Sequence, residues 1–263
     1  MSKVAVVTGG TSGIGRATAL VLKDAGYTVY ELSRRAEGVE GLHHISADVT
    51  DQQAVNDAVA QIMAAEGHID VLVNNAGFGI SGAIEFTETA EAKALFDVNF
   101  FGMVNMNRAV LPIMRQQGGG RIVNMSSVAA PIAIPFQAYY SASKAAVRTY
   151  SLALASEVRP FGIEVCVIMP GDIATGFTAA RRKSCDGDDV YHGRIARSVA
   201  VMEHDEQTGM SAEYAGQFVA RRATQKRAKL ICTMGHKYAL FVFLMRILPT
   251  GLATRIVGKI YAS

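Results

Sequence analysis

TGGTSGIG, residues 8–15, decides how the chain begins to fold. It follows KVAVVTG (3–9), a valine-rich run typical of a strand buried on both faces, and overlaps IGRATALVLKDA (14–25), whose apolar residues have helical spacing. Glycines in a strand-to-helix turn allow unusual backbone angles and close approach of a ligand, and the helix behind them offers N–H groups to an anion. The spaced glycines are Gly9, Gly13 and Gly15. A tight turn without a ligand is therefore the less favoured interpretation.

Strands and helices continue to alternate along the chain. The pattern predicts further strands at 28–32, 69–77, 121–127, 163–171 and 228–235, and further helices after Thr50, at 88–117 and at 137–158. Thr50 and Gln53 predict a capping box, and Gly26 a helix end. This alternation indicates βαβ units, hence a parallel sheet with helices on both faces. No linker or repeat divides residues 1–263, so we expect a single domain, least regular at 174–225.

Composition excludes several classes of protein. Half of the residues are hydrophobic, which allows a large core, and a net charge of +3 does not suggest a nucleic-acid partner. Three cysteines without a C-x-x-C pair indicate neither a zinc site nor disulfides, and they fit the reducing cytoplasm. No other metal-ligand cluster is visible. The apolar stretch ALFVFLM (239–245) is too short to span a bilayer. We expect it in the core or a pocket wall, with membrane-surface contact left open.

QAYYSASK (137–144) places a tyrosine and a lysine where they can interact. Tyr140 and Lys144 are four residues apart and share one face of a helix, whereas Tyr139 pairs with the uncharged Ser143. An ammonium beside a phenol lowers the phenol pKa from its usual value of about 10. We therefore predict that Tyr140 gives and takes a proton near neutral pH, and that Tyr139 packs or lines a pocket mouth.

Six motifs in this order resemble the short-chain dehydrogenases/reductases: TGGTSGIG, NNAG (74–77), Asn99 in NFFG, Ser127 in MSS, YSASK (140–144) and PGDIAT (170–175). The resemblance covers about residues 3–175 and weakens in the C-terminal third. It implies an α/β, Rossmann-type doubly wound parallel sheet and hydride transfer between a nicotinamide dinucleotide and a carbonyl carbon. It also implies four catalytic residues. Tyr140 moves the proton, Lys144 assists it and binds ribose, Ser127 donates to the substrate oxygen, and Asn99 holds a water. Ser126 ranks below Ser127.

The family pattern also implies the cofactor contacts. These are Gly9, Thr11, Ser12, Gly13, Ile14, Gly15, Ser33, Arg34, Arg35, Asp48, Val49, Asn75, Ala76, Gly77, Tyr140, Lys144, Pro170, Gly171, Ile173 and Thr175. Ser33 stands where an aspartate would select NAD, and Arg34 and Arg35 suit a 2′-phosphate, so we expect NADP(H). Arg16 offers a further cation. The alternatives are that the two arginines are surface charges and that Asp48 only starts a turn before Thr50.

The substrate side is less constrained. Residues of about 173–212 are expected to cover the substrate, and AAPIAIPF (129–136) and a hydrophobic tail at about 236–263 suggest an apolar pocket. Val199, Val201, Met202 and Met210 offer further apolar surface. We predict an apolar alcohol or ketone, such as a hydroxysteroid or related lipid. Arg181, Arg182 and Lys183 bind an anionic end or are solvated. The alternatives are a 3-oxoacyl thioester reductase and a non-catalytic NADP(H) sensor. The resemblance also implies a homodimer or homotetramer.

Overall fold

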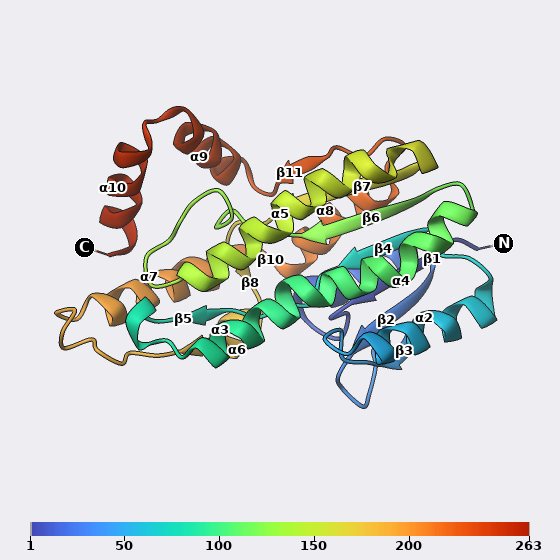
Figure 1. Cartoon of the computed structure of the whole chain (residues 1–263), viewed down its shortest axis with the longest axis horizontal. Helices are drawn as coiled ribbons and strands as arrows, with labels where there is room; N and C mark the ends of the chain where they lie inside the picture. Colours follow the sequence, from blue (N-terminus) through green and yellow to red (C-terminus); the bar gives the residue numbers. More distant parts are fainter. Residues whose placement is uncertain (1, 263) are drawn as a thin grey trace.

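The computed structural model describes residues 2–262 and shows one doubly wound α/β domain (Figure 1). Its central sheet is entirely parallel, as predicted. In spatial order, the strands are β11 (Ile231–Thr233), β7 (Ile163–Met169), β6 (Gly120–Met125), β4 (Val71–Asn74), β1 (Val4–Thr8), β2 (Thr28–Ser33) and β3 (His43–Ser46). The strand order reverses between β1 and β4, where open α/β sheets bind ligands beyond the carboxyl ends of their strands.

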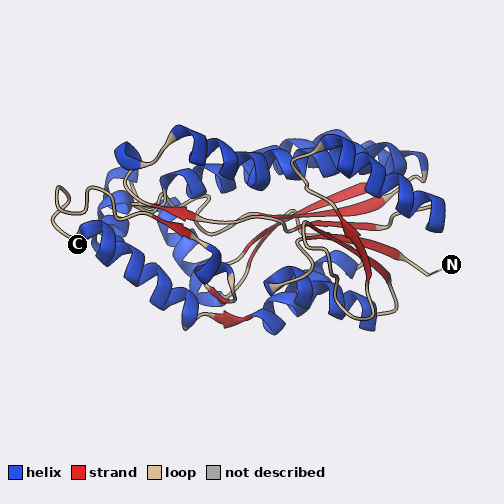
Figure 2. Ribbon diagram, turned by 90° about the horizontal axis from the view of Figure 1, so that it is seen from below, coloured by secondary structure: helices blue, strands red, loops and turns tan. Residues whose placement is uncertain are grey.

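Helices cover both faces of the sheet (Figure 2). One apolar core lies under α2 (Gln52–Glu66), α4 (Gly102–Gln116) and α5 (Ala138–Val158). A second core lies under α1 (Gly13–Asp24) and α8 (Ala212–Thr224), where a Cβ on Gly216 would come within 2.6 Å of Ala17. The two helices therefore pack with almost no space between their backbones. α8 falls in the segment expected to be least regular, and that expectation was wrong.

Further elements lie outside the central sheet. They are β5 (Ile80–Ser81), η1 (Ile84–Phe86), η3 (Arg159–Phe161), β8 (Ile173–Ala174), α6 (Phe177–Ala180), β9 (Arg182–Lys183), α7 (Arg194–Gln207), β10 (Met210–Ser211), α9 (His236–Ile247) and α10 (Thr250–Tyr261). β8 pairs with β10, so α7 is tied to the loop that leaves β7. Among residues 2–262, no helix combines the length and apolarity needed to cross a bilayer.

Three local predictions need correction. Asp51, not Thr50, caps α2, because its carboxylate accepts hydrogen bonds from the backbone N–H groups of Gln53 and Ala54. The helical region 88–117 consists of α3 (Thr89–Phe96), a π-helical turn η2 (Asp97–Phe101) and α4. The edge strand β3 was not predicted. Gly26 follows the end of α1 with a φ of +87°, as expected.

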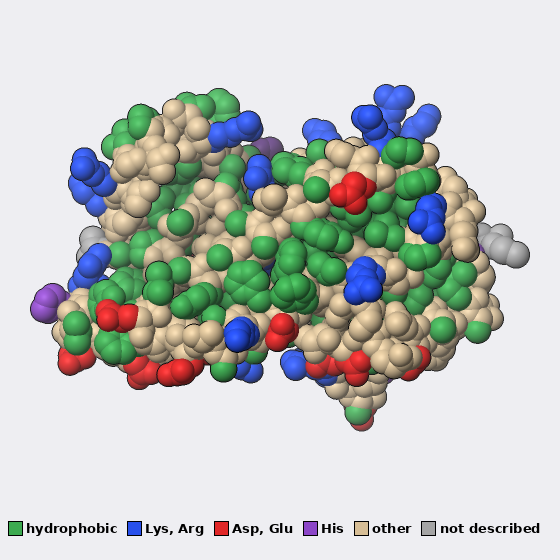
Figure 3. Space-filling view, viewed as in Figure 1, with side chains coloured by type: hydrophobic (Ala, Val, Ile, Leu, Met, Phe, Trp, Pro, Cys, Tyr) green, Lys and Arg blue, Asp and Glu red, His purple; other side chains and the backbone are tan. Residues whose placement is uncertain are grey.

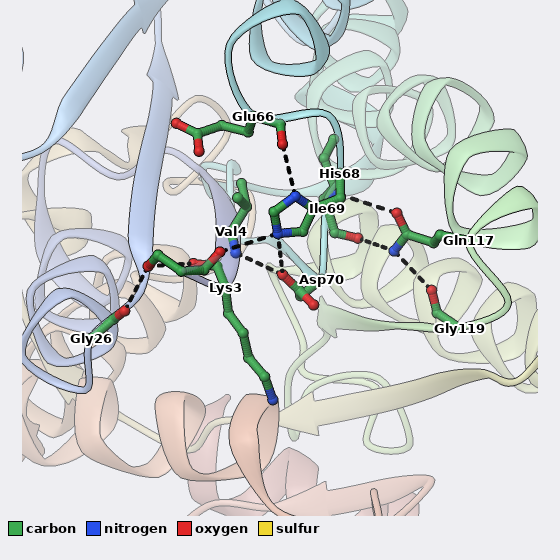
Figure 4. A network of polar contacts seen from close by, with 10 residues as sticks. Lys3, Val4, Gly26, Glu66, His68, Ile69, Asp70, Gln117 and Gly119 are labelled. Carbon is green, nitrogen blue, oxygen red and sulfur yellow. Dashed lines mark hydrogen bonds and ion pairs between the residues drawn. The ribbon is translucent and has the colours of Figure 1, made fainter.

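A polar network connects the amino-terminal ends of the central strands, at the end of the sheet away from the strands' carboxyl ends (Figure 4). The Asp70 carboxylate accepts from the N–H of Val4 at 2.7 Å and lies 3.3 Å from Nε2 of His68. Gln117 donates to the carbonyl oxygen of Ile69 at 2.6 Å and thereby ties the end of α4 to the start of β4. These contacts hold the first strand in place at the edge away from the turn that follows it.

A second network is buried between the sheet and the helices above it. Nδ2 of Asn74 donates to Oδ1 of Asn107 at 2.9 Å and to Oδ1 of Asn124 at 2.8 Å. Nδ2 of Asn124 donates in turn to Ser151 on α5 at 2.8 Å. Because all four side chains are buried, each depends on its neighbours for hydrogen bonding.

Replacing Asn124 by alanine should lower the free energy of unfolding by about 2–4 kcal/mol, because Asn74 and Ser151 each lose a buried partner. Urea unfolding measures this loss. Asn56→Ala is the control, since Asn56 is exposed on α2, and it should change stability by less than about 0.5 kcal/mol. Equal urea midpoints for Asn124→Ala and the wild type would show that this network does not contribute to stability.

Candidate active site

Two adjoining cavities lie at the carboxyl ends of the strands. The first encloses about 380 Å³ and extends from the glycine turn past Tyr140 to α9 and α10. The second encloses about 480 Å³ and lies against the ends of β2 and of the segment after β3. Both reach the size of small-molecule sites. The cavities share Gly9, Arg35, Ala76, Gly77 and Phe78, so they form one continuous groove across the reversal point.

The glycine turn shapes the middle of this groove. Gly9 has a φ of +66° and Gly13 a φ of +51°, and a Cβ on Gly9 would lie 3.1 Å from the Cα of Ala76. Gly15 has a different role from that predicted: it lines neither cavity, and its Cβ would meet the Gly9 carbonyl oxygen at 2.3 Å. Among the described residues, no side chain caps α1 at Ser12. Ser12, Gly13 and Ile14 line the first cavity, so the amino end of α1 borders the groove, as an anion such as a pyrophosphate requires.

The NNAG segment is held against the end of β1. The Thr8 hydroxyl accepts from the N–H groups of Asn75 and Ala76, both at 3.0 Å, and Asn75 donates back to the Thr8 carbonyl oxygen at 3.1 Å. These bonds keep the backbone of Asn75, Ala76 and Gly77 in the wall of the groove.

Tyr140, Lys144 and Ser127 converge in the first cavity. Tyr140 and Lys144 come from the first two turns of α5, and Ser127 follows the end of β6 and lies close enough to the phenol to lower its pKa. Nζ of Lys144 lies 5.7 Å from the centre of the Tyr140 ring and donates to the Met125 carbonyl oxygen at 3.0 Å. The three predicted side chains therefore share one site.

The expected lowering of the Tyr140 pKa by Lys144 was wrong for the chain by itself. Burial raises the pKa of Tyr140 to about 12, against smaller lowering effects of the Ser127 hydrogen bond and the Arg181 charge. Burial also lowers the pKa of Lys144 to about 8. Desolvation prevails because both groups leave water, whereas the ammonium makes its hydrogen bond to a carbonyl and not to the phenol. The phenol is therefore a proton donor at neutral pH.

The neighbouring candidates have structural roles. Ser126 donates its hydroxyl proton to the Lys144 carbonyl oxygen at 2.8 Å, so it holds α5 against β6. Tyr139 lines neither cavity, and its hydroxyl lies 3.5 Å from the Ile84 carbonyl oxygen. Both observations agree with the choice of Ser127 and Tyr140.

Asn99 is buried in the π-helical turn η2. Its amide accepts from the Phe78 N–H and donates to the Phe78 carbonyl oxygen, each at 2.9 Å, and it also donates to Ser143 at 3.3 Å. Its side chain thus positions the backbone after Gly77. The water-holding role remains a prediction, because these bonds already engage both ends of the amide.

The second cavity contains the residues predicted to select the cofactor. Thr11, Ser33, Arg34, Arg35, Asp48 and Val49 all line it. Arg35 donates to the Thr11 carbonyl oxygen at 3.4 Å, and Arg34 lies 3.9 Å from Asp48. Glu31 points away and is buried against His44 with an O–N distance of 2.5 Å. The exposed Arg16 lines neither cavity.

Asp48 fits both alternatives left open for it. Its carboxylate accepts from the N–H of Thr50 at 2.9 Å and from the Thr50 hydroxyl at 2.8 Å, so it does start a turn. It also lines the cavity. All other predicted cofactor contacts except Gly15 line one of the two cavities, including Pro170, Gly171, Ile173 and Thr175 after β7.

The basic run 181–183 is neither solvated throughout nor arranged for an anion. Arg181 is buried and ion-paired with Glu206, Lys183 pairs with Glu203, and Arg182 lies 5.0 Å over the Phe78 ring. Val199 and Met202 belong to a small buried cluster with Ile195 and do not line the cavity. Their predicted role in an apolar substrate surface was wrong.

Several cavity residues were not predicted. Asp172 accepts from the Tyr238 hydroxyl at 2.7 Å, and Glu206 accepts from Thr178 at 2.7 Å. Burial is the main cause of a raised pKa for both carboxyls. Gln137 and Phe177 also line the cavity and were not predicted. The ring centre of Phe177 lies 5.9 Å from that of Tyr140. Asp172 lies inside PGDIAT, but Glu206 lies where the resemblance weakens.

No group of three or more His, Cys, Asp or Glu side chains within residues 2–262 is arranged to hold a metal ion. The groove brings together a phenol, a hydroxyl and a buried lysine at the carboxyl ends of the strands.

Comparisons with known proteins agree with this geometry. The chain is 41% identical over 227 residues to a 3-ketodihydrosphingosine reductase of Bacteroides thetaiotaomicron, covering 85% of this chain and 84% of that protein. It is 33% identical over 264 residues to dehydrogenase/reductase SDR family member 7B of Xenopus tropicalis, covering 94% and 82%. A short-chain dehydrogenase structure from Streptomyces avermitilis matches with a TM-score of 0.84 at 32% identity, over 98% and 94% of the two chains. The short chain dehydrogenase family pattern matches residues 3–186, and the chain belongs to that family.

Proposed function

We propose that the protein is an NADPH-dependent reductase of a ketone in a long-chain lipid. The observation that carries this proposal is that Ser127, Tyr140 and Lys144 lie in one cavity whose wall also contains an apolar part. Ala129, Ile132, Ile134, Phe177 and Phe241 supply that wall. The relative named 3-ketodihydrosphingosine reductase makes a long-chain 2-amino-3-ketone the first substrate to test. A ketosteroid stays in the same apolar class and is the second.

Tyr140 donates the proton in this scheme. When bound, the nicotinamide supplies a hydride to the carbonyl carbon. As that carbon is reduced, its oxygen takes the phenol proton of Tyr140, which the raised pKa keeps in place. Ser127 donates a hydrogen bond to the same oxygen while negative charge develops there. Lys144 stays positively charged below its pKa of about 8 and offsets the charge left on the phenolate.

The groove fits a dinucleotide with a 2′-phosphate. Gly9 and Gly13 leave room for backbone approach, and the amino end of α1 suits a pyrophosphate. At the far end, Ser33 brings no negative charge, and Arg34 and Arg35 face the second cavity. Glu31, the nearest acid on β2, is held by His44. These side chains favour NADP(H) over NAD(H) because a carboxylate at position 33 would repel the extra phosphate.

Asp172 and Glu206 favour an amine beside the ketone. Both line the cavity, and both charges raise the pKa of Tyr140, so they lie within electrostatic range of the phenol. Glu206 has Arg181 as its partner, whereas Asp172 has the uncharged Tyr238 hydroxyl. A substrate ammonium would compensate the charge of the Asp172 carboxylate. A 3-oxoacyl thioester carries no such cation, and the sensor alternative leaves the proton donor without a purpose.

Two further proposals complete this picture. We infer a cytoplasmic protein, supported by free thiols at Cys166, Cys185 and Cys232. We also keep a homodimer or homotetramer as the proposed assembly.

Consumption of NADPH with the 2-amino-3-ketone, its des-amino analogue, a ketosteroid and a 3-oxoacyl thioester tests the function as a whole. If none of the four is reduced, the proposal fails.

Replacing Tyr140 by phenylalanine should lower kcat by about 10²- to 10⁴-fold, because the proton donor is lost. NADPH binding, followed by cofactor fluorescence, should persist. Tyr139→Phe is the matched control and should keep near-wild-type activity, because Tyr139 lies outside both cavities. In the reverse direction, the wild-type oxidation rate should rise with pH, because the phenolate is the minor species below a pKa of about 12. Retained activity in Tyr140→Phe would contradict the mechanism.

Replacing Arg34 or Arg35 by alanine should raise KM for NADPH by about tenfold or more and leave KM for NADH nearly unchanged, because only the 2′-phosphate loses its partner. Arg16→Ala is the control, since Arg16 is exposed and lies outside both cavities. Initial rates with both cofactors give these values. A wild-type protein that prefers NADH at equal concentration contradicts the assignment of NADP(H).

Asp172→Asn should lower kcat/KM for the 2-amino-3-ketone by about tenfold, or about 1.4 kcal/mol, because it removes the carboxylate charge that the amine would compensate. The rate with the des-amino ketone should change little. Asp24→Asn is the control, because Asp24 is exposed at the end of α1 and lines neither cavity. Asp172→Asn keeps an acceptor for Tyr238, so it preserves the local fold. Equal losses with both ketones would contradict recognition of the amine.

A further inference from the structure

The helix pair α9 and α10 has an apolar outer surface. Leu240, Phe243, Leu244 and Ile247 are exposed on α9 at relative positions of zero, three, four and seven residues, so they form one stripe. Leu252 and Ile260 are exposed on α10. These six residues are here named the C-terminal apolar face. They are six of the thirteen exposed large hydrophobic side chains in the described part of the chain. A helix covered by water on its outer side normally places polar residues there.

The other side of the same helices borders the proposed active site. Tyr238 and Phe241 of α9 and Tyr261 of α10 line the cavity that contains Tyr140. The ring of Tyr238 packs where a Cβ on Gly171 would lie, within 2.3 Å. The helix pair is therefore a wall between the cavity and the C-terminal apolar face.

Charge is distributed unevenly around this wall. Residues 236–263, which include α9 and α10, contain four of the 26 Lys and Arg and none of the 23 Asp and Glu. Lys237, Arg246 and Arg255 are exposed on α9 and α10 themselves. Figure 3 shows hydrophobic and basic side chains over this part of the molecule, at upper left, and most of the visible acidic side chains along the lower edge.

We propose that the C-terminal apolar face docks on an anionic lipid surface, with α9 lying in the plane of the interface. Apolar side chains flanked by Lys and Arg match the acyl boundary and the phosphate layer of such a surface. A second copy of this chain is the less suitable occupant, because each face carries the exposed Lys237, Arg246 and Arg255, and α9 and α10 contain no acidic residue to pair with them. If the proposed lipid substrate is correct, docking also places the cavity wall where the substrate resides. The docking itself does not rest on that substrate.

Sedimentation with lipid vesicles tests the docking. The whole protein, without substrate, is mixed with vesicles of phosphatidylcholine alone or with added phosphatidylglycerol. It should pellet with the anionic vesicles and about tenfold less with the neutral ones. The triple variant Leu240→Ser, Phe243→Ser, Ile247→Ser should lose about tenfold in the bound fraction. Arg246→Gln with Arg255→Gln should also weaken binding, and 1 M salt should weaken it in the wild type, because the Debye length is then about 3 Å.

Ile84→Ser with Val190→Ser is the matched control. Both side chains are 61% exposed, as Ile247 is, but lie outside the C-terminal apolar face. This variant should bind vesicles as the wild type does. Equal binding by the triple variant, or no binding of the wild type to anionic vesicles, overturns the proposal. So does a triple variant that changes the oligomeric state in light scattering but not vesicle binding, because the face is then a subunit interface.

Activity on a short water-soluble ketone separates this proposal from the proposed function. The triple variant should keep the wild-type rate on that ketone, because none of its three positions lines the cavity. A protein that binds vesicles but reduces no ketone would retain the docking and refute the function. One that reduces ketones but ignores anionic vesicles would do the reverse.

Discussion

The hydrogen bond from the buried Lys144 ammonium to the Met125 carbonyl oxygen is the contact on which the site depends. It joins α5 to the carboxyl end of β6, and the Ser126 hydroxyl reinforces the join from the strand side. Because Tyr140 lies one helical turn before Lys144, this anchor also places the phenol beside Ser127. The free-energy cost of burying the Lys144 ammonium, which lowers its pKa, is reduced because the carbonyl oxygen replaces part of the lost hydration.

Sequence patterns predicted an element correctly wherever a single local rule determines its structure. Buried valine runs identified β1 and β4, and the glycine turn identified the groove at the reversal point. β3 escaped because its four residues, HHIS, lie at an edge and carry no hydrophobic alternation. The cap of α2 was misplaced by one residue, since Thr50 and Asp51 are both good caps and only the backbone geometry separates them.

The helical spacing of Tyr140 and Lys144, together with the family resemblance for Ser127, identified side chains that share one cavity, but neither predicted their electrostatics. The pKa of Tyr140 follows from how far the phenol is removed from water, which depends on long-range packing. Asp172 and Glu206 illustrate the same limit, because one belongs to the loop after β7 and the other to α7, and tertiary contacts such as the β8–β10 pairing bring these segments together. The basic run at 181–183 was misjudged because its acidic partners are 20 or more residues away.

The π-helical turn between α3 and α4 has a consequence for tolerated sequence length. A π turn contains one residue more than the α-helical turn it replaces. Deleting one residue from Asp97–Phe101 would convert this turn into a regular α-helical turn. Met106, Val110 and Met114, now fully buried, would keep their places in the core, because the residue is removed where the extra one stands, but Asn99 would lose its place against Phe78. The extra residue of this turn is therefore required by the groove and not by the core.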